Sequence, residues 1–166
     1  MNQPPLGRVD YLTRKIQPLL PYCRRGEAKL QLKELLEPRC GLVKYTPGSS
    51  PEILDYYVDK GYRGIVLEGT GLGHVASDWI DGIRRATEDG VPVVITSQGL
   101  RGRICDRVYD TGRYMLDAGA IEGEDMLPEV ALVKLMWVLA NKPDEVRSLM
   151  KTPLAGEIGF STPITV

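Results

Sequence analysis

The glycine-rich segment Gly69-Thr70-Gly71-Leu72-Gly73-His74 is the part of this chain whose residue types point most directly to ligand binding. It follows residues 64–68, a run apolar enough to form a strand covered on both faces. Glycines let a backbone approach a bound group closely, and a helix beginning after the turn would offer free N–H groups and partial positive charge. The segment therefore predicts a site for an anionic group or a carboxylate. The alternative is that the glycines serve only a tight turn and close helix–strand packing.

Two common nucleotide-binding motifs fit this segment poorly. Gly69 and Gly71 match the start of Gly-x-Gly-x-x-Gly, but His74 occupies the sixth position. After the next predicted strand, the run Thr96-Ser97-Gln98 stands where an acid that binds ribose is expected. No Gly-Lys-Ser/Thr follows a glycine run, which excludes a P-loop.

His74 is the only histidine, and its imidazole can exchange a proton near neutral pH. A capping or packing role at the start of a helix is the alternative. No serine or cysteine nucleophile adjoins it in the sequence. A second candidate is the arginine cluster of Arg101, Arg103, Arg107 and Arg113, because guanidinium groups suit carboxylate or phosphate recognition. A solvated loop, or ion pairs between subunits, is the favoured interpretation of that cluster.

Composition excludes several classes of protein. The 166 residues correspond to about one domain, and 43% apolar with 26% charged residues is typical of a globular chain. A net charge of -1 gives no sign of a nucleic-acid or membrane-surface binder. The longest apolar stretch, residues 130–140, contains Lys134 and is too short to span a membrane. Three cysteines without a Cys-x-x-Cys pair indicate a reduced, cytoplasmic chain, and with one histidine they predict neither a metal site nor a cofactor.

The order of elements predicts the α/β class, as a three-layer sandwich with a small parallel sheet preceded by a short linker or hairpin. Residues 1–39 are predicted to be an interlobe linker with one edge strand at residues 8–12, and residues 40–166 the α/β domain. Strand-like runs cover residues 42–45, 64–68 and 91–95, and helical periodicity covers residues 51–60, 75–89, 109–117, 128–140 and 143–150. The helix at 128–140 is apolar almost all round, so we expect it to be heavily buried. The acids Glu122, Glu124, Asp125 and Glu129 are expected to favour its N-terminus.

Several longer runs together resemble the C-terminal lobe of the L-asparaginase superfamily, over roughly residues 8–158. They are Gly61-Tyr62-Arg63-Gly64-Ile65-Val66-Leu67-Glu68-Gly69-Thr70-Gly71-Leu72-Gly73-His74, Pro92-Val93-Val94-Ile95-Thr96-Ser97-Gln98, Val108-Tyr109-Asp110-Thr111-Gly112-Arg113, Glu124-Asp125-Met126-Leu127-Pro128-Glu129, Lys134-Leu135-Met136-Trp137 and Leu154-Ala155-Gly156-Glu157-Ile158. These motifs are specific in combination, whereas the glycine turn alone is not.

The resemblance implies that the chain holds no catalytic residue of its own. In the superfamily the nucleophilic threonine of a Thr-Gly-Gly-Thr motif, a Thr-Asp pair and a lysine lie in an N-terminal catalytic lobe, and none has a matching segment here. The C-terminal lobe packs against that lobe and against a homodimer partner, and the position of His74 reaches toward the neighbour's substrate. The implied contact surface, called the substrate wall below, consists of Gly69, Thr70, Gly71, Gly73, His74, Arg107 and Tyr109.

The same runs are similar to the archaeal tRNA-dependent amidotransferase branch of the superfamily. That similarity implies release of ammonia from glutamine or asparagine for the conversion of Glu-tRNA(Gln) to Gln-tRNA(Gln). The implied partners are the N-terminal lobe, an amidotransferase partner subunit and, through the complex, tRNA, with no membrane involved. Three alternatives stay open at this point. They are the C-terminal half of a cytosolic L-asparaginase, a stand-alone small-ligand-binding module and a purely structural domain.

Overall fold

A four-stranded parallel sheet forms the centre of the molecule. The computed structural model describes residues 5–27, 29 and 31–159. The sheet consists of β3 (Cys40–Lys44), β4 (Gly64–Gly69), β5 (Val93–Ser97) and β6 (Ile121–Glu122), in that spatial order. Val66 stands at the centre, opposite Leu42 on one side and Val94 on the other. The middle strands carry almost no charge because helices cover both of their faces.

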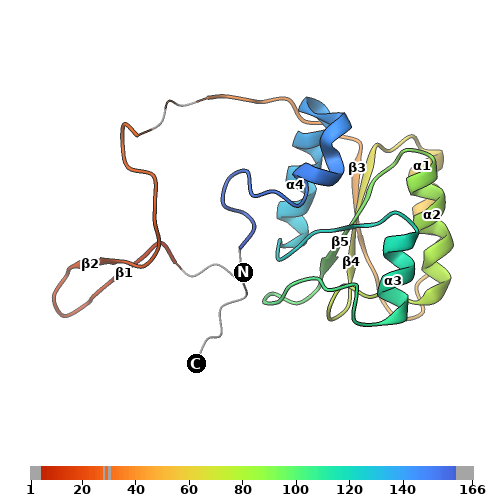
Figure 1. Ribbon diagram of the computed structural model, residues 1–166, viewed down its shortest axis with the longest axis horizontal. Helices are drawn as coiled ribbons and strands as arrows, with labels where there is room; N and C mark the ends of the chain where they lie inside the picture. Colours follow the sequence, from red (N-terminus) through yellow and green to blue (C-terminus); the bar gives the residue numbers. More distant parts are fainter. Residues whose placement is uncertain (1–4, 28, 30, 160–166) are drawn as a thin grey trace.

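Helices lie on both faces of this sheet (Figure 1). On one face are α1 (Glu52–Asp59), α2 (Ile80–Glu88) and α3 (Asp110–Asp117). On the other are α4 (Pro128–Asn141) and α5 (Val146–Leu149), which follows the short 3-10 turn η2 (Pro143–Glu145). Strand residues alternate between the two cores, so Ile65 and Leu67 pack toward α1–α3 while Val66 packs toward α4. The predicted three-layer α/β sandwich is confirmed. No helix in the described part of the chain has the length and apolarity to cross a membrane.

Some local predictions differ from the structure. The helix expected from residue 75 begins later, as a 3-10 turn η1 (Ser77–Trp79) that continues into α2, because Ala76 is still extended at φ -68°, ψ 157°. The strand β6 has no counterpart in the predicted elements. It is only two residues long, and one of them is Glu122, a residue type that is uncommon in strands. Glu122 is buried at the edge of the sheet, where it pairs with Arg107.

The N-terminal segment projects away from the sandwich as an arm (Figure 1). It carries an antiparallel hairpin of β1 (Gly7–Val9) and β2 (Ile16–Pro18). The strand expected over residues 8–12 ends at Val9 instead. The cause is Asp10, whose Oδ1 accepts hydrogen bonds from the backbone N–H groups of Leu12 and Thr13, both at 2.9 Å, and so starts a turn.

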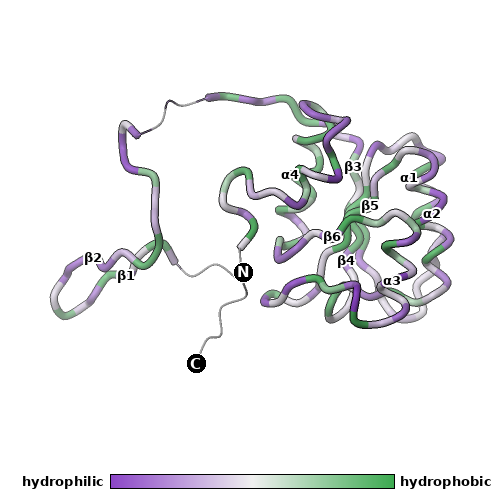
Figure 2. The backbone as a smooth tube through the Cα atoms, in the orientation of Figure 1, coloured by the Kyte–Doolittle hydropathy of each residue, from purple (hydrophilic) through white to green (hydrophobic). Residues whose placement is uncertain are grey.

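The chain between the arm and the sheet runs along α4, where Figure 2 shows alternating apolar and polar segments. The N–H of Glu37 donates to the carbonyl of Met136 at 2.9 Å, and the side chain of Asn141 donates to the carbonyl of Leu35 at 3.0 Å. These contacts cover only part of α4, and Val133 on the same helix is 55% exposed. The expectation of a heavily buried helix therefore holds for Ala131, Leu135 and Val138 but not for the face that carries Val133.

Candidate functional site

The glycine turn closes on itself rather than opening a helix. The N–H of Thr70 donates to the carbonyl of His74, and the N–H groups of Gly73 and His74 donate to the carbonyl of Thr70, each at 2.9 Å. The hydroxyl of Thr70 also donates to the carbonyl of His74, at 3.1 Å. These donors are satisfied inside the turn, and η1 begins only at Ser77. The expectation of free helix N-terminal N–H groups at the turn is therefore wrong.

The three glycines of the turn have different structural reasons. A Cβ atom on Gly69 would lie 2.2 Å from the carbonyl oxygen of Gly73. A Cβ on Gly73, whose φ is +108°, would lie 2.8 Å from the side chain of Ile104. Gly71 is exposed with φ +56°, and a Cβ there would have no atom within 4 Å. Close packing thus accounts for Gly69 and Gly73, whereas Gly71 presents open backbone to the surroundings.

Three loops meet at the carboxyl end of the sheet, as the parallel arrangement predicts. The Gln98 side-chain amide donates to the carbonyl of Tyr45 at 2.5 Å and to that of Glu68 at 3.2 Å. The hydroxyl of Ser97 donates to the carbonyl of Gly71 at 2.5 Å and accepts from the N–H of Gly99 at 3.0 Å. The glycine turn is therefore held in place by side chains that follow the neighbouring strand.

This bracing can be tested with Ser97→Ala. The substitution leaves the carbonyl of Gly71 without its side-chain donor and the N–H of Gly99 without its acceptor. We expect the free energy of unfolding to fall by about 1–2 kcal/mol in urea titrations. The matched control is Ser148→Ala, which removes a single exposed bond to the carbonyl of Glu145 and is expected to change stability by less than about 0.5 kcal/mol. Equal effects would contradict a special role for Ser97.

His74 and Tyr109 are brought together although they lie far apart in the sequence. Their ring centroids are 5.2 Å apart at an interplanar angle of 76°, an edge-to-face contact. The Nε2 atom of His74 is buried and has no hydrogen-bond partner among the described residues. Burial lowers the pKa of His74, so its imidazole is neutral at pH 7. Tyr109 is 59% exposed, so it offers its outer surface to solvent while covering the imidazole.

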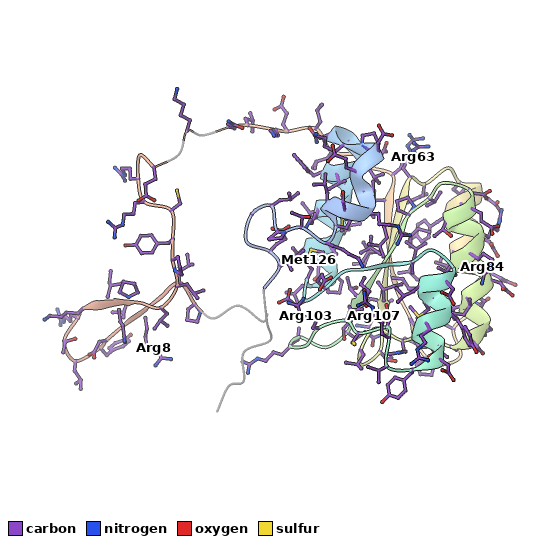
Figure 3. All side chains as sticks on the ribbon, viewed as in Figure 1. Arg8, Arg63, Arg84, Arg103, Arg107 and Met126 are labelled. Carbon is purple, nitrogen blue, oxygen red and sulfur yellow. The ribbon has the colours of Figure 1, made fainter. Side chains whose placement is uncertain are left out.

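Three members of the arginine cluster, Arg103, Arg107 and Arg113, pair with acids. Figure 3 labels Arg103 and Arg107 on this side of the sandwich. Arg107 lies 3.1 Å from the Glu122 carboxylate, and Arg103 lies 2.5 Å from that of Glu124. Asp125 accepts the backbone N–H of Gly159 at 2.9 Å. Of the four acids expected to favour the start of α4, only Glu129 lies in its first turn, and the other three hold the arginine loop and the C-terminal segment.

Asp106 is a buried acid whose sequence context marks it only as a neighbour of the arginines. It is completely buried, and neither carboxylate oxygen has a hydrogen-bond partner among the described residues. Burial, followed by the charge of Glu122, raises the pKa of Asp106 to about 7, against an opposing effect of Lys151. No pattern in the arginine-rich loop distinguishes this aspartate from its exposed neighbour Asp110.

The described residues offer no metal centre. In residues 5–27, 29 and 31–159, no three or more His, Cys, Asp or Glu side chains are grouped so that they could hold an ion. The arrangement instead provides exposed backbone at Gly71, a neutral imidazole and an aromatic ring. Such a surface can contact a small polar ligand but presents no activated nucleophile of its own.

Curated relatives carry a similar sequence over nearly the whole chain. It is 59% identical over 160 residues to the D-type subunit of the glutamyl-tRNA(Gln) amidotransferase of Methanosarcina barkeri, covering 95% of this chain and 38% of that protein. It is 57% identical over 163 residues to the protein of the same name from Archaeoglobus fulgidus, covering 98% of this chain and 39% of that protein. The resemblance found in the sequence motifs is confirmed, and the chain spans under two fifths of these relatives.

Solved structures agree with the family at the level of the fold. The thermostable L-asparaginase of Thermococcus kodakarensis superposes with a TM-score of 0.84 at 32% identity, covering 97% of this chain and 49% of that one. L-asparaginase I of Vibrio cholerae gives a TM-score of 0.82 at 27% identity, covering 95% of this chain and 48% of that one. Residues 39–150 match the sequence family described as the glutaminase/asparaginase C-terminal domain. With the sandwich and glycine turn in place, the chain belongs to the glutaminase/asparaginase C-terminal domain family.

Proposed function

We propose that this chain is the C-terminal lobe of the asparaginase-like subunit of a tRNA-dependent amidotransferase. In this proposal the complete subunit releases ammonia from glutamine or asparagine, and a partner subunit uses it to convert Glu-tRNA(Gln) to Gln-tRNA(Gln). The reaction takes place in the cytoplasm, where tRNA is charged. Residues 1–39 connect to an N-terminal catalytic lobe and residues 40–166 form the lobe itself. The names of the relatives supply the reaction class.

The observation that carries the proposal is that this chain could contact a ligand at the candidate site from one side only. In open parallel sheets, ligands bind in the crevice where the strand order reverses. Here the order β3-β4-β5-β6 follows the sequence, and α1, α2 and α3 all lie on one face, so the four described strands form no such crevice. A ligand at Gly71 would be contacted from this chain along one surface. A second lobe would supply the opposite surface and the nucleophile.

Each residue of the substrate wall has a proposed role. The open backbone at Gly71 lets a small amide substrate lie close, and Gly69 and Gly73 shape the turn that presents it. His74, neutral and buried at Nε2, faces the substrate edge, with Tyr109 as its cover. Arg107 forms the rim through its exposed guanidinium, 73% accessible at the side-chain level. Thr70 stabilises the turn through its hydroxyl.

The test is reconstitution with a separately expressed N-terminal lobe taken from one of the archaeal amidotransferase relatives. The chain alone is expected to release no ammonia from glutamine or asparagine, and the mixture is expected to release it, as measured by a coupled ammonia assay. His74→Ala is expected to lower the rate of the mixture by about tenfold, which corresponds to about 1.4 kcal/mol of transition-state stabilisation. Arg84→Ala, on the exposed side of α2 (Figure 3), is the control and should leave the rate unchanged.

Ammonia release by the chain alone would overturn the proposal. An unchanged rate of the mixture with His74→Ala would also overturn it. A cytosolic L-asparaginase half is the second candidate, favoured by the TM-score of 0.84 to the Thermococcus kodakarensis enzyme. Adding the amidotransferase partner subunit and Glu-tRNA(Gln) separates the two. Formation of Gln-tRNA(Gln) supports the amidotransferase, whereas free ammonia with no effect of the partner supports the asparaginase.

A further inference from the structure

The loop of residues 104–109 carries Arg107 and Tyr109, two members of the substrate wall. One side of this loop is fixed to the glycine turn, because the N–H of Cys105 donates to the carbonyl of Leu72 at 3.2 Å. Its back lies against α3, where a Cβ on Gly112 would come within 2.3 Å of the carbonyl oxygen of Asp106. α3 also holds the loop through Arg113, whose Nε donates to the carbonyl of Arg107 at 3.2 Å, and the N–H of Ile104 donates to the carbonyl of Glu124 at 2.9 Å.

Glu122, in β6 at the edge of the sheet, is the side chain that attaches residues 106 and 107 of this loop to the sheet. Its Oε1 accepts the backbone N–H of Asp106 at 3.4 Å, and its Oε2 lies 3.1 Å from the guanidinium of Arg107. The ammonium of Lys151 approaches the same Oε2 to 3.2 Å. The Glu122 side chain is only 8% exposed. Charge-assisted hydrogen bonds are stronger at such a site than at an exposed surface, because little water competes for the groups.

We propose that Glu122 is a positioning residue for the substrate wall, fixing the loop of residues 104–109 so that the ring of Tyr109 stays against His74. The proposal rests on the proposed function for its catalytic meaning, but the geometry it describes belongs to this chain alone. Glu122 touches neither ring. It acts through the backbone of Asp106 and the guanidinium of Arg107, with Lys151 as the second counter-charge. Loss of its carboxylate is expected to free the loop and to separate the two rings.

The experiment uses the fact that His74 is the only histidine, so the chain gives a single imidazole Hε1 resonance in proton NMR. An edge-to-face ring at 5.2 Å displaces that resonance by its ring current. Tyr109→Leu removes the ring and defines the position of the signal without the contact. Glu122→Ala is expected to move the signal at least halfway to that position. The pKa of His74, lowered by burial in the parent, is expected to rise as the imidazole becomes exposed.

Two further variants keep the test decisive. Glu124→Ala removes a neighbouring carboxylate that pairs with Arg103 instead, and it should leave the signal of His74 at the parent position. Glu122→Gln retains an acceptor for Asp106 but not the charge, so it should give a smaller displacement in the same direction. This variant decides the matter if Glu122→Ala does not fold.

The proposal would be overturned if the His74 resonance stayed at the parent position in both Glu122 variants. It would also be overturned if Glu124→Ala displaced that resonance as far as Glu122→Ala does. An unshifted signal in Tyr109→Leu would also overturn it, because the ring contact would then be absent in solution. None of these measurements depends on ammonia release. A failed reconstitution would therefore refute the proposed function and leave this inference unaffected. An unshifted His74 resonance in the Glu122 variants would refute this inference and leave the proposed function unaffected.

Discussion

Replacing Asp106 with asparagine is expected to remove a pH dependence of about 4 kcal/mol from the stability of this chain. The folded state holds the pKa of Asp106 at about 7, against an ordinary value of 3.8. The folded chain therefore binds this proton more tightly than the unfolded chain does. The contribution of Asp106 is most favourable below about pH 4, declines as the pH rises to 7, and stays low above it, with each pKa unit worth about 1.4 kcal/mol.

The measurement is urea unfolding of the parent and of Asp106→Asn between pH 4.5 and 8.5. His74 contributes with the opposite sign, because burial lowers its pKa, and the difference between the two proteins cancels that contribution. The free energy of unfolding of Asp106→Asn should exceed that of the parent most at pH 8, by about 2 kcal/mol. This figure allows for the cost of burying the new amide without a hydrogen-bond partner. Asp110→Asn is the control, since its carboxylate is 79% exposed. A variant that keeps the pH slope of the parent would show that Asp106 does not titrate in this range.

Gly69→Ala is expected to be among the most damaging single substitutions in the chain, costing at least about 4 kcal/mol. The new Cβ would lie 2.2 Å from the carbonyl oxygen of Gly73 and 2.4 Å from its carbonyl carbon. Both are backbone atoms that the paired hydrogen bonds between Thr70 and His74 prevent from moving away. Thermal and urea unfolding of the purified variant measure the loss.

Gly71→Ala is the matched control for this prediction. No atom stands within 4 Å of its Cβ position, so only the left-handed backbone at φ +56° opposes the change. That conformation costs a non-glycine residue about 1–2 kcal/mol. A larger loss at Gly71 than at Gly69 would contradict the turn geometry described above.

The layers of this fold could be predicted from sequence because periodicity reports on burial. The alternation of strands and helices from Cys40 onward follows the two cores closely, and the convergence of Gln98 with Tyr45 and Glu68 follows from parallel strands. The failures are local. Asp10 ended a strand early through its own side chain, and β6 was too short and too charged to resemble a strand.

In the candidate site too, features local in the sequence could be predicted, and contacts between distant residues could not. The glycine turn is a contiguous run, so the sequence could single it out as a candidate. The contact between His74 and Tyr109 and the attachment of Arg107 to Glu122 join residues that lie far apart in the chain. The burial of Asp106 depends on α3 and on the sheet edge together. None of these leaves a periodic signal, because each arises only when separate elements pack.

The N-terminal hairpin has a consequence for the binding of any partner that covers it. Its strands of three residues pair only with each other in the described part of the chain, and Tyr11 and Ile16 are 94% and 74% exposed. A lone two-stranded hairpin is marginally stable in water, so its amide protons should exchange far faster than those of β4 and β5. Ordering it on docking costs about 1–2 kcal/mol per residue fixed. That entropy is subtracted from the contact energy, so cross-linking the hairpin into its paired form would tighten the association without adding a contact.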